Sequence, residues 1–152
     1  MAMLREGELA PDFELEADDG ARVSLDELLA HGPLILYFYP ADFTAICTAE
    51  ACSIRDVHEE VVEVGMRVVG VSPQSASSHE RFRRRHDLPF PLLYDASKRT
   101  IRAYGVDGPL GLGVRRVTFL IGTDKIVKGR VVSDLFVGSH TDFIRQCIAR
   151  AR

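Results

Sequence analysis

The sequence predicts an α/β fold in which helices cover a central sheet that is partly parallel. The unbroken run of apolar, β-prone residues 34–39 has the length of a strand that is buried on both faces, and residues 66–72 indicate a second buried strand. Between them, apolar residues from Cys47 to Val64 recur every three or four positions, which indicates a helix. Because a helix that joins two neighbouring strands makes them parallel, the two runs indicate the middle of the sheet.

The other elements follow from turn and cap signals. Phe13 and Leu15 alternate with acidic residues up to an Asp-Gly pair at 19–20, which indicates an N-terminal β-hairpin. Ser24 and Glu27 have the spacing of a capping box, and Gly-Pro at 32–33 ends the short helix that they begin. Residues 88–91 indicate an extended loop and residues 105–113 a glycine-rich loop. Helices are predicted at 77–86, 98–104 and 142–151, and strands at 117–121 and 125–132.

The length and the net charge of the chain limit the classes of function that it can have. The chain has 152 residues, which is the size of one domain, and a formal net charge of −3. This charge provides no basic field for nucleic acid or an anionic membrane, and it favours a small or neutral substrate. Acidic residues in the opening stretch and the lack of a long apolar run predict a cytoplasmic location. Thiols are kept reduced there, so the cysteines are expected to be free.

Cys47 stands where a reactive thiol is expected. It follows the strand at 34–39 and falls in the first turn of the next helix, the end of the sheet where α/β proteins place their sites. Thr44 is predicted to be the helix N-cap, and Cys47 comes three residues later among unpaired backbone N–H groups. The positive end of the helix dipole favours the thiolate, which is the nucleophile. A small core residue is the alternative interpretation of Cys47.

Pro40, Thr44 and Cys47 match the three fixed positions of the peroxiredoxin signature Pro-x-x-x-Thr-x-x-Cys. The sequence resembles this family over nearly its full length, and residues 48–56 resemble the Q-type subfamily, also called bacterioferritin comigratory protein. The resemblance implies one domain over residues 1–152, with a thioredoxin-like fold and an N-terminal β-hairpin. Two closing strands followed by a helix are also typical of that fold. Ala45 and Ile46 stand where the subfamily usually has Pro-Gly, and the β-branched Ile46 is expected to stiffen the first turn of the helix.

The resemblance implies a thiol-dependent peroxidase that reduces hydrogen peroxide and organic hydroperoxides. Cys47 would be the peroxidatic residue, and Cys52 would resolve its sulfenic acid as an intramolecular disulfide. In an α-helix the two Cα atoms would lie about 8.6 Å apart. A disulfide requires no more than about 7 Å, so the helix must unwind during the cycle.

The same resemblance assigns the surrounding residues. Thr44 and Arg116 would stabilise the charge on the departing oxygen, and Pro40 would shield the site from water. Glu50 would hold Arg116 without touching the peroxide. Arg115 is a second candidate for the role of Arg116. The alternatives are a surface arginine on a strand and a solvated glutamate on a helix.

The expected partners are a hydroperoxide substrate and thioredoxin or a similar dithiol reductant, with no nucleic acid and no membrane. The protein is expected to be a monomer or a weak homodimer that uses no cofactor and no metal, because the histidine and cysteine spacings match no familiar zinc site. Cys147 is predicted to pack in the core and to be dispensable. The basic run 81–86 is more typical of a solvated helix face than of a nucleic-acid site.

Three other functions stay open at this point. The first is a peroxide-sensing or chaperone-like binding protein that uses the same cysteine. The second is a one-cysteine peroxidase that an external thiol resolves. The third, a disulfide oxidoreductase, expects the spacing Cys-x-x-Cys, and Cys47 and Cys52 are further apart than that.

Overall fold

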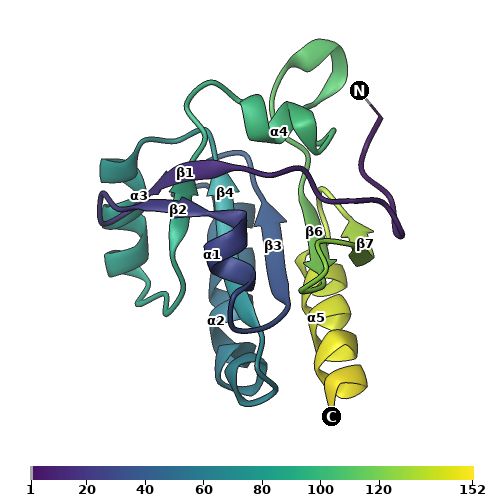
Figure 1. Ribbon diagram of the computed structural model, residues 1–152. Helices are drawn as coiled ribbons and strands as arrows, with labels where there is room; N and C mark the ends of the chain where they lie inside the picture. Colours follow the sequence, from purple (N-terminus) through teal and green to yellow (C-terminus); the bar gives the residue numbers. More distant parts are fainter. Residues whose placement is uncertain (1) are drawn as a thin grey trace.

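The structure is a computed structural model that describes residues 2–152 and contains a seven-stranded mixed sheet with helices on both faces (Figure 1). The strand order is β2-β1-β5-β4-β3-β6-β7. Strands β3, β4 and β5 are parallel to one another, and every other neighbouring pair is antiparallel. The elements are β1 (Glu14–Ala17), β2 (Arg22–Ser24), α1 (Leu25–Leu29), β3 (Leu34–Phe38), α2 (Ala45–Glu63), β4 (Arg67–Ser72), α3 (Ala76–Arg85), β5 (Leu92–Tyr94), α4 (Arg99–Ala103), the 3₁₀ turn η1 (Pro109–Gly111), β6 (Val117–Ile121), β7 (Val127–Val132) and α5 (Val137–Ala151).

The predicted central strand is buried on both faces. All five residues of β3 are buried, and successive side chains point to opposite sides of the sheet. Leu34, Leu36 and Phe38 pack in one hydrophobic cluster with residues of α1 and α4. Ile35 and Tyr37 pack in the other cluster, with residues of α2, α3 and α5. The second cluster matters for function, because it contains Cys47 and Cys147.

The helix boundaries agree with most of the predicted caps. Ser24 accepts a hydrogen bond from Glu27 N at 3.2 Å at the start of α1, as predicted. Gly65 follows α2 with a φ of 79°, a left-handed conformation that glycine adopts without strain. Among the described residues, no helix combines the length and the apolar character that crossing a membrane requires.

Two elements differ from the prediction. Strand β5 was not predicted, because it has only three residues and follows Pro89 and Pro91. Its pairing with β4 and β1 stabilises it, which a local pattern cannot show. Helix α5 begins at Val137, five residues before the predicted start, although this stretch holds residues that are poor helix formers. His140 and Thr141 are buried there, so tertiary packing stabilises this first part of the helix.

Candidate active site

The loop that follows β3 leads directly into the first turn of α2. Thr44 is the last residue before the helix, and its carbonyl oxygen accepts a helical hydrogen bond from Thr48 N at 2.9 Å. Cys47 is the third residue of α2, and only 2% of its surface is exposed. Backbone N–H groups in a first helical turn lack helical partners and concentrate positive charge there. The start of α2 therefore surrounds the thiol with groups that favour a thiolate.

Thr44 occupies the predicted N-cap position, but the prediction is wrong for its side chain. The hydroxyl Oγ1 donates to Ala41 O at 3.1 Å and accepts no hydrogen bond from the helix. A bond within the loop has therefore replaced the cap. As a result, the N–H groups of the first turn of α2 keep no side-chain partner from Thr44.

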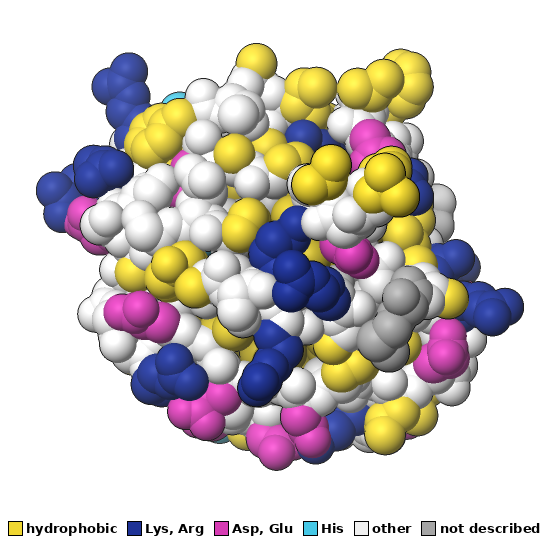
Figure 2. All heavy atoms as spheres, turned by 90° about the horizontal axis from the view of Figure 1, so that it is seen from above, with side chains coloured by type: hydrophobic (Ala, Val, Ile, Leu, Met, Phe, Trp, Pro, Cys, Tyr) yellow, Lys and Arg dark blue, Asp and Glu magenta, His cyan; other side chains and the backbone are white. Residues whose placement is uncertain are grey.

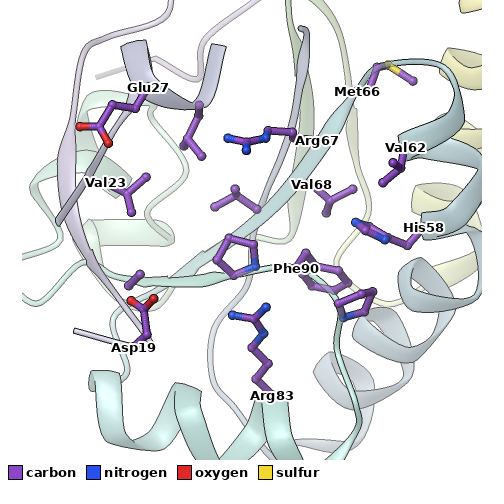
Figure 3. Close-up of a pocket in the computed structure, with 15 residues that line it drawn as sticks. Asp19, Val23, Glu27, His58, Val62, Met66, Arg67, Val68, Arg83 and Phe90 are labelled. Carbon is purple, nitrogen blue, oxygen red and sulfur yellow. The ribbon is translucent and has the colours of Figure 1, made fainter. Parts of the chain in front are cut away.

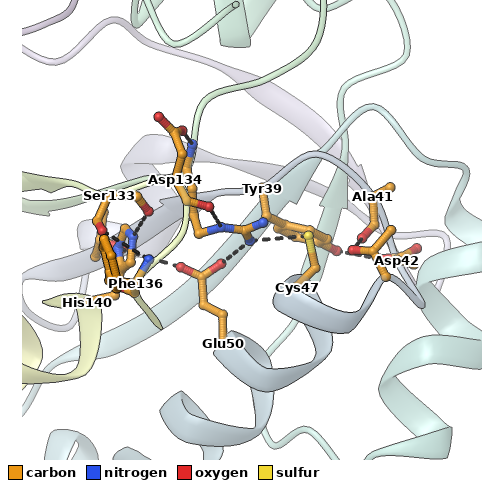
Figure 4. A network of polar contacts seen from close by, with 12 residues as sticks. Tyr39, Ala41, Asp42, Cys47, Glu50, Ser133, Asp134, Phe136 and His140 are labelled. Carbon is orange, nitrogen blue, oxygen red and sulfur yellow. Dashed lines mark hydrogen bonds and ion pairs between the residues drawn. The ribbon is translucent and has the colours of Figure 1, made fainter. Parts of the chain in front are cut away.

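The pairing of β6 with β3 brings Arg116 to Cys47. Phe38, the last residue of β3, is opposite Val117, the first residue of β6, so residue 116 lies where the loop to α2 begins. Arg116 Nη1 lies 3.2 Å from Cys47 Sγ and 2.9 Å from Glu50 Oε1, and it donates to both (Figure 4). Arg116 is 4% exposed and Glu50 is fully buried. Two hydrogen bonds from Arg116 thus connect three of the predicted site residues, Cys47, Glu50 and Arg116 itself.

Asp134 decides which of the two neighbouring arginines faces the thiol. Arg116 is held through its backbone N–H, which donates to Asp134 Oδ1 at 3.0 Å, and through Nε, which donates to Asp134 O at 3.3 Å. Arg115 turns toward solvent and pairs with Asp134 Oδ2 at 2.8 Å. The alternative candidate Arg115 therefore has no contact with Cys47.

Two opposing effects act on the pKa of the Glu50 carboxyl group. Burial raises its pKa from 4.5 to about 7, although the charge of Arg116 and its hydrogen bond act in the opposite direction. Oε1 accepts from Arg116, whereas Oε2 is buried without a hydrogen-bond partner. Oε2 is therefore the oxygen that carries the proton when Glu50 is neutral.

His140 faces that free oxygen and was not predicted as a site residue. Its Nδ1 lies 3.5 Å from Glu50 Oε2. Nε2 donates to Ser133 O at 2.8 Å, and Nδ1 lies 2.8 Å from the Thr118 hydroxyl. Burial lowers the pKa of His140, and the charge of Arg116 lowers it further. No periodic pattern marks His140 as a site residue, because its contact with Glu50 depends on how α5 packs on α2.

The remaining predicted site residues are Cys52, Pro40 and Thr44. Cys52 is on the same helix as Cys47, is half-buried and is a free thiol. Pro40 is half-buried at the start of the loop, and Thr44 is exposed. Because α2 runs unbroken through Cys47 and Cys52, the two Cα atoms are separated by about 8.6 Å in ideal helix geometry.

The third cysteine lies in an apolar environment. Cys147 is buried in the cluster that α2 and α5 share, and burial raises the pKa of its thiol to about 11. Among residues 2–152, no group of three or more histidine, cysteine and acidic side chains is arranged to hold a metal ion.

Three loops meet at the end of the sheet where Cys47 lies. The loop before α2, the loop before β6 and the loop after β7 are adjacent because Phe38 pairs with Val117 and Val117 pairs with Val132. Each of these loops exposes large hydrophobic side chains, and the view from above shows apolar side chains gathered on this face (Figure 2). The exposed residues are Phe43, Leu110, Leu112, Leu135 and Phe136.

A separate pocket of about 470 Å³ lies at the opposite end of the sheet (Figure 3). Val68, Phe90 and Arg67 line it. Arg67 begins β4, whereas Cys47 follows the end of the parallel strand β3. None of the predicted site residues lines this pocket, so the chemistry centred on Cys47 does not use it.

Comparisons with known proteins identify the family of the chain. The model of the AhpC/TSA family matches residues 7–130, so the chain belongs to the AhpC/TSA family. Peroxiredoxin Bcp from Bacillus subtilis is 40% identical over 134 residues, which cover 84% of this chain and 82% of the relative.

Solved structures of peroxiredoxins match almost the whole chain. The crystal structure of peroxidoxin BcpB from Mycobacterium tuberculosis has a TM-score of 0.91 and 35% identity, and it covers 98% of this chain and 99% of its own. Peroxiredoxin Q from Xanthomonas campestris has a TM-score of 0.83 and 29% identity, with 92% of each chain covered. This protein is therefore a peroxiredoxin of the Bcp and Q type, a thiol peroxidase, and its predicted thioredoxin-like fold is confirmed.

Proposed function

We propose that Cys47 is the peroxidatic residue of this thiol peroxidase. The single observation that carries the proposal is the hydrogen bond from Arg116 to Cys47 Sγ in the first turn of α2. A guanidinium and unpaired N–H groups stabilise a thiolate even where the thiol is buried. A cysteine that only packs in the core needs neither the guanidinium nor the N–H groups.

The first chemical step is a displacement at the O–O bond. The Cys47 thiolate attacks one oxygen of the hydroperoxide, an S–O bond forms, and the O–O bond breaks. The departing oxygen takes up a proton and leaves as water or an alcohol, and Cys47 becomes a sulfenic acid. Arg116 and N–H groups of the first turn stabilise the negative charge that grows on that oxygen, and the Thr44 hydroxyl does so once it turns from Ala41 O to the peroxide. Pro40 limits access of water, and Glu50 holds Arg116 in place.

The second step is resolution by Cys52. The Cys52 thiol attacks the sulfenic sulfur, a disulfide forms, and the hydroxyl leaves as water. This step requires residues 44–52 to leave the helical conformation, because bridged cysteines need Cα atoms within about 7 Å. The ordered helix activates Cys47 for attack, and the unwound helix allows the disulfide.

The apolar rim of the site supports organic hydroperoxides as substrates beside hydrogen peroxide. Phe43, Leu112 and Phe136 are exposed on loops at this end of the sheet. A structure of the Xanthomonas campestris bacterioferritin comigratory protein, 28% identical, concerns its alkyl peroxide reduction activity. An alkyl chain gains free energy when it leaves water for such a surface.

The reaction also needs a reductant, and the location and oligomeric state of the protein follow from the sequence as proposals. Peroxiredoxins act with thioredoxin-type reductants, and we propose such a dithiol as the donor that reduces the Cys47–Cys52 disulfide. We also propose a cytoplasmic location and a monomer or weak homodimer. A single domain over residues 1–152 stays a prediction, and the single sheet of the described residues supports it.

The deciding experiment is rapid-mixing oxidation of the purified protein by hydrogen peroxide, followed by mass mapping of the cysteines. The expected product is the Cys47–Cys52 disulfide. Amides of residues 47–54 should lose hydrogen-exchange protection on oxidation, while those of β3 keep it. A disulfide with unchanged protection would contradict the unwinding step. A persistent Cys47 sulfenic acid would instead assign a one-cysteine mechanism with an external thiol.

A further inference from the structure

A second buried polar network lies beside Cys47, on the side away from Glu50 (Figure 4). Asp42 belongs to the loop 40–44 that joins β3 to α2. Its carboxylate accepts hydrogen bonds from the Tyr39 hydroxyl at 2.6 Å and from the Ser78 hydroxyl at 2.7 Å, and it contacts His79 Nδ1 at 2.8 Å. The side chains of Asp42 and His79 are fully buried. Such a fully satisfied buried network fixes the conformation of the segments that it joins.

Each ring nitrogen of His79 faces an acceptor. Nε2 lies 3.0 Å from Leu93 O in β5, and a carbonyl oxygen can only accept, so Nε2 carries a proton. Nδ1 faces Asp42 Oδ2, the other acceptor. The Tyr39 hydroxyl, 3.3 Å from Nδ1, donates to Asp42. These contacts tie loop 40–44 to both α3 and β5.

The loop that this pair holds is strained. Phe43, next to Asp42, has a φ of 63°, a conformation that is unfavourable for a bulky residue. Half of Phe43 is exposed, and its ring contacts Phe82 of α3 at a centroid distance of 5.2 Å. Strain of this kind persists only where the surroundings enforce it. The buried bonds of Asp42 supply that constraint directly before the first turn of α2.

We propose that the Asp42–His79 pair positions the reactive thiol by holding loop 40–44, which sets where α2 presents Cys47 to Arg116. The inference rests on the proposed role of Cys47. Asp42 and His79 act through the backbone of residues 43–46, so they are positioning residues. Because a misplacement of about 1 Å can slow a reaction by about 100-fold, a loosened loop is expected to slow the attack on peroxide.

The test compares two replacements of His79. In His79→Asn the amide N–H₂ can replace Nδ1–H and donate to Asp42, whereas the bond to Leu93 is lost. In His79→Gln the amide reaches the position of Nε2 and keeps the bond to Leu93, whereas the bond to Asp42 is lost. Asp42→Asn is the matching change on the other side of the pair. Asp95→Asn is the control, because Asp95 is also a buried carboxylate but caps α4 through Ile101 N at 2.7 Å.

Three measurements are made on each full-length variant. They are the rate of Cys47 oxidation by hydrogen peroxide, the pH midpoint of Cys47 alkylation by iodoacetamide read from its peptide mass, and the urea midpoint of unfolding. His79→Gln and Asp42→Asn should oxidise about tenfold more slowly, with an alkylation midpoint about one pH unit higher. His79→Asn should stay within about twofold of the wild-type rate. Asp95→Asn should lose stability without either change.

The outcomes separate positioning from stability. Equal rate losses in His79→Asn and His79→Gln would assign the pair a structural role only and overturn the proposal, and so would wild-type rates in every variant. If His79→Gln does not fold, Ser78→Ala removes one donor to Asp42 and should slow oxidation about threefold. An unchanged rate in Ser78→Ala would then overturn the proposal. If peroxide does not oxidise wild-type Cys47, the proposed function fails, while the alkylation midpoints still test the positioning.

Discussion

Cys47 and Cys147 are both buried in the same hydrophobic cluster, yet their surroundings differ. Burial raises the pKa of Cys147 to about 11, and Arg150, whose charge acts in the opposite direction, does not cancel this effect. Cys47 accepts a hydrogen bond from Arg116 and lies at the N-terminal end of its helix. Burial in an apolar cluster disfavours a thiolate, whereas burial against a charged donor and a helix N-terminus favours it. The position on the helix and the partner, rather than exposure, distinguish the two cysteines.

The comparison also shows what the reactive site requires from its surroundings. Arg116 is balanced by Glu50, and Glu50 in turn has an oxygen without a hydrogen-bond partner. A buried ion pair recovers only part of the cost of removing its charges from water. Cys147 needs no such support, because a neutral thiol packs like a small apolar side chain.

The largest expected difference is in turnover. Cys47→Ser should abolish peroxide consumption, since serine keeps the size of cysteine but supplies no thiolate. Cys147→Ser is the matched control and should consume peroxide at the wild-type rate. Peroxide loss with a dithiol reductant measures both, and circular dichroism checks that both variants fold. Turnover by Cys47→Ser would exclude the peroxidatic role.

Removing the charged donor should make Cys47 more like Cys147. Arg116→Ala is expected to slow oxidation by about 10²- to 10³-fold, the usual loss for a donor that stabilises a transition state. The alkylation midpoint of Cys47 should move to higher pH because a neighbouring positive charge has gone. Arg115→Ala, which removes only the exposed pair with Asp134, is the control and should change neither value. A full rate in Arg116→Ala would place the stabilisation in other groups.

The pH dependence of the free energy of unfolding measures what it costs to bury the charged form of Glu50. Its pKa in the folded protein, about 7, is higher than the ordinary value of 4.5, so the folded state binds the proton more tightly. This contribution to stability is present below about pH 4.5 and is lost as the pH rises through 7. Relative to Glu50→Gln, the free energy of unfolding of the wild type should fall by about 3 kcal/mol over that window. Urea titrations at several pH values measure it, and parallel curves would show that folding does not raise the pKa of Glu50.

The smallest expected effect concerns the packing cysteine. Cys147→Ala removes one buried sulfur atom and should lower the free energy of unfolding by about 1 kcal/mol. Its peroxidase rate should equal that of the wild type. Iodoacetamide at pH 7 should modify Cys47 well before Cys147, because a thiol with a pKa of about 11 is almost entirely protonated there. Faster labelling of Cys147 in the folded protein would contradict the comparison.

Local rules in the sequence determined most of the elements and the position of Cys47 on its helix. The buried strands, the long helix with Cys47 in its first turn, and the capping of α1 by Ser24 follow from periodicity and cap chemistry over a few residues. The resemblance to peroxiredoxins added Arg116 and Glu50, which the structure brings into contact with each other, and Arg116 also contacts the thiol.

Only the tertiary structure decided the features that depend on distant parts of the chain. Strand β5 forms because β4 and β1 pair with it. The choice of Arg116 over Arg115 depends on Asp134. The buried histidines beside Glu50 and Asp42 come from α5 and α3. Asp42 and His79 are 37 residues apart, and no period or spacing links them. Local sequence controls backbone conformation, whereas the positions of buried polar groups depend on how the elements pack, because each group needs a partner that folding alone can supply.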